Sequence, residues 1–430
     1  MNSFKIANLG KKNPDGGKGF FYGWLVAVAC FVMVFISLGL GNLTSALYIT
    51  PVTEELKFSR GAFSFVFSLR FISSAVFSIL LNFFIRKFEI RKVIGIGFSM
   101  LVLSYFLFSV ARDLPVFYLS AIPYGIGITF NATAIVSILI ERWFEKHKGL
   151  ILGVIFAGSG LGGSLFNIIV AGWIEKYGWS KSYFFTAVCL GICAIPILAT
   201  IRNNPCEMKL KPYGSEEQEQ SGKKSKRVNW EGFTMEESLR KPYFYLAAIA
   251  IFFIGFLNSP VYTIAPAHLI DRGFDANYTA TIMSLFFFTL AGAKIIMGFI
   301  YDRFGLKNAL IVCFISNICG IMLLAFAQNK LIATLFALFF GFSVTIETVT
   351  LPLLVFELFG PKTYTATIGL FLAISTIGVS IGTPVMNFSY DVTGSYKGML
   401  IIFDVISVLV FALFMYIINY AQKDRNEYIV

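Results

Sequence analysis

The sequence predicts an all-α membrane protein with twelve transmembrane helices, arranged as two six-helix halves. Its 430 residues are 57% hydrophobic and only 14% charged, whereas a soluble domain carries about 25% charged residues. The hydrophobic residues fall in runs of about twenty, the length that an α-helix needs to cross a bilayer. Because lipid offers no partner for an unpaired backbone group, these runs are expected to be helices.

One long polar segment divides the spans into two sets of six. The first apolar run starts at Phe20 and is too long for the core of a signal peptide, so we expect it to remain as helix 1. Residues 202–241 are expected to be a flexible cytoplasmic linker between an N-terminal half, 1–201, and a C-terminal half, 242–430. The expected helices are 21–48, 60–85, 92–111, 115–140, 149–174, 182–201, 242–268, 277–301, 307–327, 330–356, 364–390 and 398–420.

The distribution of basic residues predicts the orientation in the cell membrane. With both termini in the cytoplasm, 25 of the 35 lysines and arginines fall in inside segments and 8 in outside loops. This asymmetry follows the positive-inside rule. The net charge of +11 is therefore explained by membrane topology, and no nucleic-acid partner is expected.

An internal repeat relates the two halves. A shift of 216 residues aligns thirteen pairs of identical or similar residues without gaps. Since each half has an even number of spans, the halves insert the same way up and are related by a pseudo-twofold axis along the membrane normal. This arrangement is typical of a secondary transporter with its substrate path between the halves, near the bilayer midplane. The pairs include Gly153/Gly369, Ser159/Ser375, Gly162/Gly378, Gly125/Gly341, Glu141/Glu357 and Lys87/Arg303.

The junction after the eighth span carries a charged motif of five residues. It consists of Gly298, Asp302, Arg303, Gly305 and Lys307, and it resembles the signature loop of the major facilitator superfamily. Gly305 suits a tight turn, and Asp302 is expected to cap or pair at a helix end. The first-half copy departs from the pattern, because Asn82, Arg86, Lys87, Glu89 and Arg91 occupy its positions.

Shorter stretches narrow the resemblance to one branch of that superfamily. They are Phe21–Trp24, Lys148–Gly153, Tyr177–Trp179, Phe356–Gly360 and Asp391–Tyr396. These are similar to the oxalate–formate antiporters and monocarboxylate transporters. The resemblance implies the major facilitator fold and a carrier of small organic anions, mono- or dicarboxylates, working by antiport or proton symport.

Lys294 is the first candidate for anion binding. It lies eight residues before Asp302, or about 12 Å into the membrane at 1.5 Å per residue. An ionisable side chain at this depth costs at least ~2.5–3.5 kcal/mol and marks function by default. In the branch that the chain resembles, a cation four residues before the motif glycine binds the substrate carboxylate, and Lys294 holds that place. A structural ion pair is the alternative.

Two further charges lie within spans. Arg70 shares one face of the second helix with Ser74 and Ser78 and is expected either to face the substrate path or to make a structural contact. Glu347 is expected at the depth of Lys294. One hypothesis is that Glu347 pairs with Lys294 in the absence of substrate, and that an anion or a proton breaks the pair.

Four uncharged polar residues are weaker candidates for hydrogen bonds to substrate: Tyr124, Asn131, Asn42 and Asn258. Each is equally well explained by a bond to a neighbouring helix. Helices 1 and 11 carry no lysine, although members of the branch have one there, so substrate charge and coupling stay open.

Other function classes fit less well. The two histidines are far apart and the six cysteines have no metal spacing, so neither a metal nor another cofactor is expected. No catalytic constellation appears, which disfavours an enzyme. A carrier of a neutral metabolite or drug-like compound stays open, while a channel or receptor is disfavoured by the repeat. The expected partners are a small organic anion, the lipid bilayer and, for a symporter, protons; the functional unit is expected to be a monomer.

Overall fold

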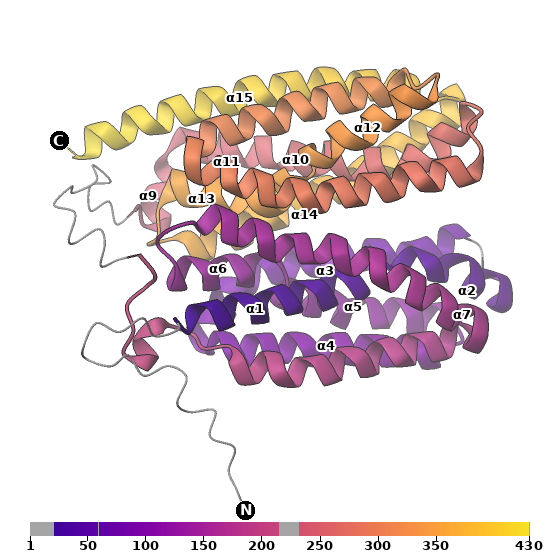
Figure 1. Cartoon of the computed structure of the whole chain (residues 1–430), viewed down its shortest axis with the longest axis horizontal. Helices are drawn as coiled ribbons and strands as arrows, with labels where there is room; N and C mark the ends of the chain where they lie inside the picture. Colours follow the sequence, from indigo (N-terminus) through magenta and orange to yellow (C-terminus); the bar gives the residue numbers. More distant parts are fainter. Residues whose placement is uncertain (1–20, 59, 215–231, 430) are drawn as a thin grey trace, which may run out of the picture.

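The computed structural model describes residues 21–58, 60–214 and 232–429, which are mostly helical (Figure 1). Ten of their helical segments are long and apolar enough to cross a membrane. Two of these, α7 (Lys148–Thr200) and α11 (Ala276–Ala325), have 53 and 50 residues, far more than the ~20 of one crossing. Each is interrupted by one glycine with positive φ, Gly178 at 80° and Gly305 at 81°. The chain therefore has the predicted twelve spans.

The helix bounds follow the predicted spans closely, except that three spans are interrupted in mid-membrane. Span 1 breaks after residue 40, span 4 breaks at residues 131–132, and span 10 contains a π-helix at residues 346–350. The N-terminal half comprises α1 (Gly23–Val34), η1 (Phe35–Leu40), η2 (Ser45–Tyr48), α2 (Ile49–Leu56), α3 (Arg60–Lys87), α4 (Ile90–Val110), α5 (Leu114–Phe130), α6 (Thr133–Trp143) and α7. The C-terminal half comprises α10 (Pro242–Asp271), α11, α12 (Lys330–Ser343), η4 (Ile346–Thr350), α13 (Leu351–Phe359), α14 (Tyr364–Thr393) and α15 (Lys397–Ile429).

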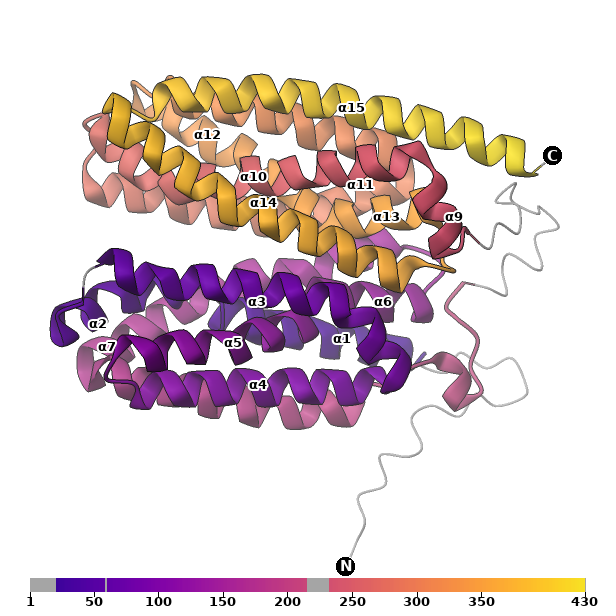
Figure 2. The same cartoon turned by 180° about the vertical axis from the view of Figure 1, so that it is seen from behind.

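The two halves form two bundles that lie side by side, with α1–α7 in one and α10–α15 in the other (Figures 1 and 2). The start of α1, the short helix α9 (Met235–Arg240) and the end of α15 all lie at one end of the molecule. We call this the linker end and the opposite one the far end. The helix interface between the halves is made chiefly by α7 with α11 and by α3 with α14.

Close backbone contacts repeat under the 216-residue shift. A Cβ atom added at Gly153 would lie 2.3 Å from the carbonyl oxygen of Lys294, and one added at Gly369 would lie 2.4 Å from that of Ser78. These two contacts are exchanged by the shift, since 153 corresponds to 369 and 78 to 294. Glycine at both places lets helices of opposite halves touch through their backbones. The pseudo-twofold arrangement of the halves is thus visible at single contacts.

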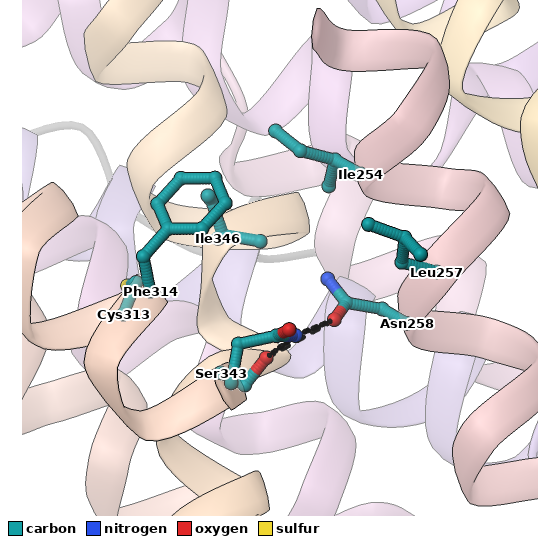
Figure 3. Close-up of a pocket in the computed structure, with 8 residues that line it drawn as sticks. Ile254, Leu257, Asn258, Cys313, Phe314, Ser343 and Ile346 are labelled. Carbon is teal, nitrogen blue, oxygen red and sulfur yellow. Dashed lines mark hydrogen bonds between the residues drawn. The ribbon is translucent and has the colours of Figure 1, made fainter. Parts of the chain in front are cut away.

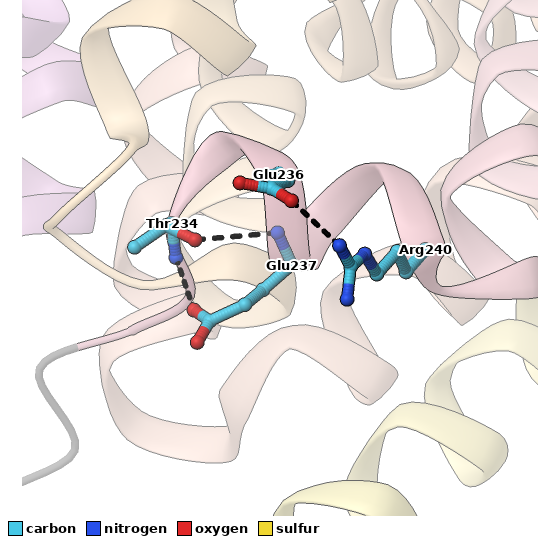
Figure 4. Close-up of polar contacts among 4 residues, drawn as sticks. All are labelled: Thr234, Glu236, Glu237 and Arg240. Atoms are coloured by element: carbon cyan, nitrogen blue, oxygen red, sulfur yellow. Dashed lines mark hydrogen bonds and ion pairs between the residues drawn. The ribbon is translucent and has the colours of Figure 1, made fainter.

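The linker flanks are folded against the bundles. Thr234 and Glu237 form a capping box that starts α9, with bonds of 3.2 and 2.6 Å (Figure 4). Backbone amides of the linker also bond to each half, Tyr213 to the Trp143 carbonyl at 2.9 Å and Phe233 to that of Phe359 at 3.0 Å. These flanks therefore differ from the flexible segment that the sequence predicts. Residues 215–231, which carry the charged runs, lie outside the described part.

We expect Gly153→Ala to destabilise the contact between the halves by about 1–3 kcal/mol, because the new methyl group would overlap a backbone oxygen that cannot move alone. Gly172→Ala on the same helix is the matched control, since a Cβ there meets nothing within 4 Å. Thermal unfolding of the purified proteins in detergent measures the difference. Equal melting temperatures for the two variants would contradict this packing.

Candidate functional site

The Lys294 side chain crosses from one half to the other. It extends from α11 and is 3% exposed. Its ammonium donates hydrogen bonds to Ser159 Oγ at 2.8 Å and to the Phe156 carbonyl at 3.3 Å, both on α7. Among the described residues no carboxylate lies within the 4.0 Å of an ion pair. A buried cation is thus held at the interface by neutral groups only.

Glu347 lies in the π-helix η4, which interrupts span 10 and also contacts α7. Its Oε1 atom is buried and accepts no hydrogen bond. The hypothesised direct pair between Lys294 and Glu347 is therefore not formed in this conformation, because Lys294 points to α7 instead. π-helical turns of this kind are frequent at functional sites.

Asn258 belongs to a polar cluster inside the C-terminal half rather than to the interface. Its Oδ1 accepts from Asn317 Nδ2 at 2.7 Å and from Ser343 Oγ at 3.0 Å (Figure 3). Ser407 Oγ donates to Asn317 Oδ1 at 2.8 Å. The cluster borders a cavity of about 10 Å³, large enough for one water molecule. The expected alternative, a bond to neighbouring helices, is what Asn258 makes here.

Asn131 occupies the position equivalent to Glu347 in the first half. It lies at the break between α5 and α6, is 0% exposed, and neither side-chain polar atom has a partner. Its amide packs so close to α4 that a Cβ added at Gly97 would lie 2.5 Å from Nδ2. Asn131 therefore faces the interior of its own bundle, and the structure brings it together with none of the other candidates.

Arg70, Tyr124 and Asn42 converge on the break in span 1. The Arg70 guanidinium is 6% exposed and lies 4.1 Å from the centroid of the Tyr124 ring. Its Nη1 donates to Ser45 Oγ at 2.9 Å. The Tyr124 hydroxyl lies 3.0 Å from the Gly41 carbonyl oxygen and 2.9 Å from Asn42 Oδ1. These three predicted residues form one cluster around residues 41–45.

The motif residues close the linker end. The Asp302 carboxylate accepts from the backbone amides of Gly149 at 3.0 Å and Leu150 at 2.8 Å, so it caps the start of α7 in the opposite half. A Cβ at Gly298 would lie 2.1 Å from the Gly149 oxygen, so the two backbones touch. The remaining motif residues, Arg303, Gly305 and Lys307, are exposed at the turn between the two spans of α11.

Comparison with known proteins decides the family. The sequence profile described as Major Facilitator Superfamily matches residues 29–383 and, in a second alignment, 247–427. The chain belongs to the major facilitator superfamily. It is accordingly a multi-pass membrane transporter and not an enzyme, and the two overlapping matches fit its repeated halves.

Individual members of the superfamily are similar to this chain over most of its length, at low sequence identity. Monocarboxylate transporter 12 of Rattus norvegicus is 21% identical over 424 residues, covering 91% of this chain and 84% of its own. Monocarboxylate transporter 2 of Homo sapiens is 25% identical over 441 residues, covering 96% and 89%. The proton:xylose symporter XylE, bound to 6-bromo-6-deoxy-D-glucose, superposes with a TM-score of 0.73 at 14% identity, covering 92% and 96%. This structural match supports the fold.

Sequence reasoning missed several residues of these clusters. Ser159 was visible only as a small residue shared by the repeat, although it receives the Lys294 ammonium. The rings of Phe67 and Phe108, which flank the Arg70 guanidinium at 5.1 and 4.8 Å, are indistinguishable in sequence from lipid-facing phenylalanines.

Replacing Asp302 by Asn should weaken closure of the linker end, because the neutral amide is a poorer cap. A loss of about 1 kcal/mol would raise the open population about fivefold. Distances between spin labels at the exposed positions Lys92 and Lys362, one on each half, report this opening. Asp275→Asn is the matched control, since Asp275 caps α11 within its own half by accepting from the Tyr278 amide at 2.8 Å. Equal distance distributions for wild type and Asp302→Asn would refute the clamp.

Proposed function

We propose that this transporter carries small carboxylate anions by alternating access, with Lys294 as the anion anchor. The observation that carries the proposal is the buried Lys294 ammonium at the interface of the halves, without a carboxylate partner among the described residues. An anion supplies the charge that the protein does not. The monocarboxylate transporters to which the chain is similar support the same substrate class.

Substrate binding at Lys294 also acts on the contact between the halves. The ammonium has three N–H donors, and two of them are directed to Ser159 and Phe156 on α7. A carboxylate that takes over these donors loosens one of the links between α11 and α7. In the described conformation Asp302 joins the two halves at the linker end. The positive-inside asymmetry supports a cytoplasmic location of this end.

Antiport and proton symport remain two modes of the proposed function. Glu347 favours a proton-coupled mode, because its buried Oε1 has no hydrogen-bond donor in this conformation. Ionisable residues within membrane spans are typical members of proton relays. A carrier of a neutral solute is the second candidate class, and we propose that the functional unit is a monomer.

Lys294→Ala should abolish carboxylate uptake into proteoliposomes, reducing it at least about 30-fold if a charge-assisted bond of ~2 kcal/mol or more is lost. Lys294→Arg, which keeps the charge, should retain part of the uptake. Lys423→Ala, which removes an exposed lysine at the linker end of α15, is the matched control.

Counterflow separates a carrier from a pore, since only a carrier is stimulated by anion on the trans side. A folded wild type that transports no carboxylate would overturn the substrate class and leave the fold untouched. Uptake that survives Lys294→Ala would overturn the role of this residue.

Glu347→Gln should abolish uptake driven by a proton gradient but leave anion exchange intact, because the amide cannot bind or release a proton. Uptake with and without an imposed pH gradient, beside homo-exchange, measures the two modes. Glu89→Gln, an exposed carboxylate with a side chain 57% accessible, is the control. If both modes survive in Glu347→Gln, this glutamate does not couple transport to protons.

A further inference from the structure

We propose that the broken segment of span 1, residues 41–44, forms a second anion subsite, which holds the distal carboxylate of a short dicarboxylate. This rests on the proposed function, in which Lys294 binds the first carboxylate. The subsite consists of the Asn42 amide, which would contact the anion, and the Arg70 guanidinium, which lies over the ring of Tyr124, the hydrogen-bond partner of Asn42, and supplies the positive charge.

Arg70 is a buried cation with no anionic partner in the part of the chain that the structure describes. Its charge is surrounded by the rings of Tyr124, Phe108 and Phe67, and its single side-chain hydrogen bond goes to Ser45. The Nε–H group is buried and donates to nothing. Aromatic faces lower the free energy of a buried guanidinium by about 0.5–2 kcal/mol but do not neutralise it. A positive potential therefore persists at the break.

The Asn42 side chain is oriented so that its amide N–H groups can donate to an anion at this break. Its side chain is exposed, and its Oδ1 accepts from the Tyr124 hydroxyl at 2.9 Å. That bond directs the amide nitrogen away from Tyr124, and neither of its two hydrogens has a partner among the described residues. The backbone beside it is fixed, because the hydroxyls of Tyr105 and Tyr124 both approach the Gly41 carbonyl oxygen. Two free N–H donors and a buried cation are thus held by the same tyrosine, Tyr124.

The helix α7 sets the distance between this subsite and Lys294. Ser159 receives the Lys294 ammonium, and four residues further along the same helix Gly163 packs against Leu43, with a Cβ at Gly163 lying 2.6 Å from the Leu43 side chain. Four residues correspond to about 6 Å of helix. The break in span 1 and the Lys294 ammonium therefore contact α7 about one helical turn apart. A short dicarboxylate bound at Lys294 would extend its second carboxylate toward this break.

The two subsites differ in chemistry and origin. Lys294 is a compact point charge from the C-terminal half, whereas Arg70 is a planar guanidinium from the N-terminal half. A dicarboxylate would touch both halves at once, and a monocarboxylate would leave the Arg70 charge uncompensated. This predicts a preference for dianions over monoanions of similar size.

The test compares uptake of labelled succinate and lactate into proteoliposomes by wild type, Arg70→Gln and Asn42→Ala. Arg70→Gln keeps a donor for Ser45 but removes the charge, and we expect the ratio of succinate to lactate uptake to fall at least about tenfold. Asn42→Ala leaves Arg70 in place and should lower the ratio in the same direction. Arg112→Gln is the matched control with an unchanged ratio, because Arg112 also lies over an aromatic ring, 5.1 Å from that of Trp179, but outside the subsite.

The outcomes are distinct. An equal loss of succinate and lactate uptake in both variants, with unchanged melting temperatures, would show that the cluster only braces span 1 and would overturn the subsite. A wild type that carries lactate but not succinate would also overturn it, while leaving Lys294 and the proposed function intact. A wild type that carries neither would overturn the proposed function itself.

Discussion

A charge buried in the membrane must find a partner, because neither lipid nor an apolar bundle can solvate it. Lys294 and Arg70 meet this constraint in different ways. Lys294 reaches across the interface to a serine hydroxyl and a backbone carbonyl, while Arg70 lies among aromatic rings of its own bundle. In neither place does a described carboxylate neutralise the charge. Such an arrangement stabilises the protein less than an ion pair would, and it leaves both cations able to bind an anion.

The two halves share a scaffold but differ in charge. Small residues repeat where helices touch, as at Gly125 against Ser73 and Gly341 against Thr289. The charges within the spans and the capping aspartate do not repeat. Lys294 corresponds to Ser78, Glu347 to Asn131, Asp302 to Arg86 and Arg70 to Phe286. Phe286 stacks on Phe340 in the C-terminal half, and the equivalent residues of the N-terminal half, Arg70 and Tyr124, also contact each other. The same two positions therefore touch in both halves, through two aromatic rings in one and through a cation and a ring in the other. The scaffold repeats because both halves pack their helices in the same way, whereas the charges within the spans differ between the halves.

The sequence predicted those features that depend on hydropathy and spacing. The twelve spans, the 216-residue register, the turn at Gly305 and a helix-end role for Asp302 all follow from one-dimensional patterns. The interruptions of spans 1, 4 and 10 could not be predicted in this way. Hydropathy averaged over twenty apolar residues does not reveal a local change of helix type. Nor could the direction of Asn258 be predicted, since a helix face alone does not say whether it meets another bundle or its own. The partner of Lys294 required the tertiary structure for the same reason.

The helix α7 joins the anion site to the closed end. Asp302 caps its first residues, the Gly153 backbone touches that of Lys294, and Ser159 receives the Lys294 ammonium. The equivalent helix α14 has no such cap, because Arg86 stands where an acceptor would be needed and Thr363 makes no side-chain cap bond. Ten residues, or about 15 Å of helix, separate the cap from Ser159. In the proposed function, a carboxylate that displaces Ser159 from Lys294 acts on the same helix whose start Asp302 caps. The proposal thus links binding and opening through α7, on one side of the pseudo-axis.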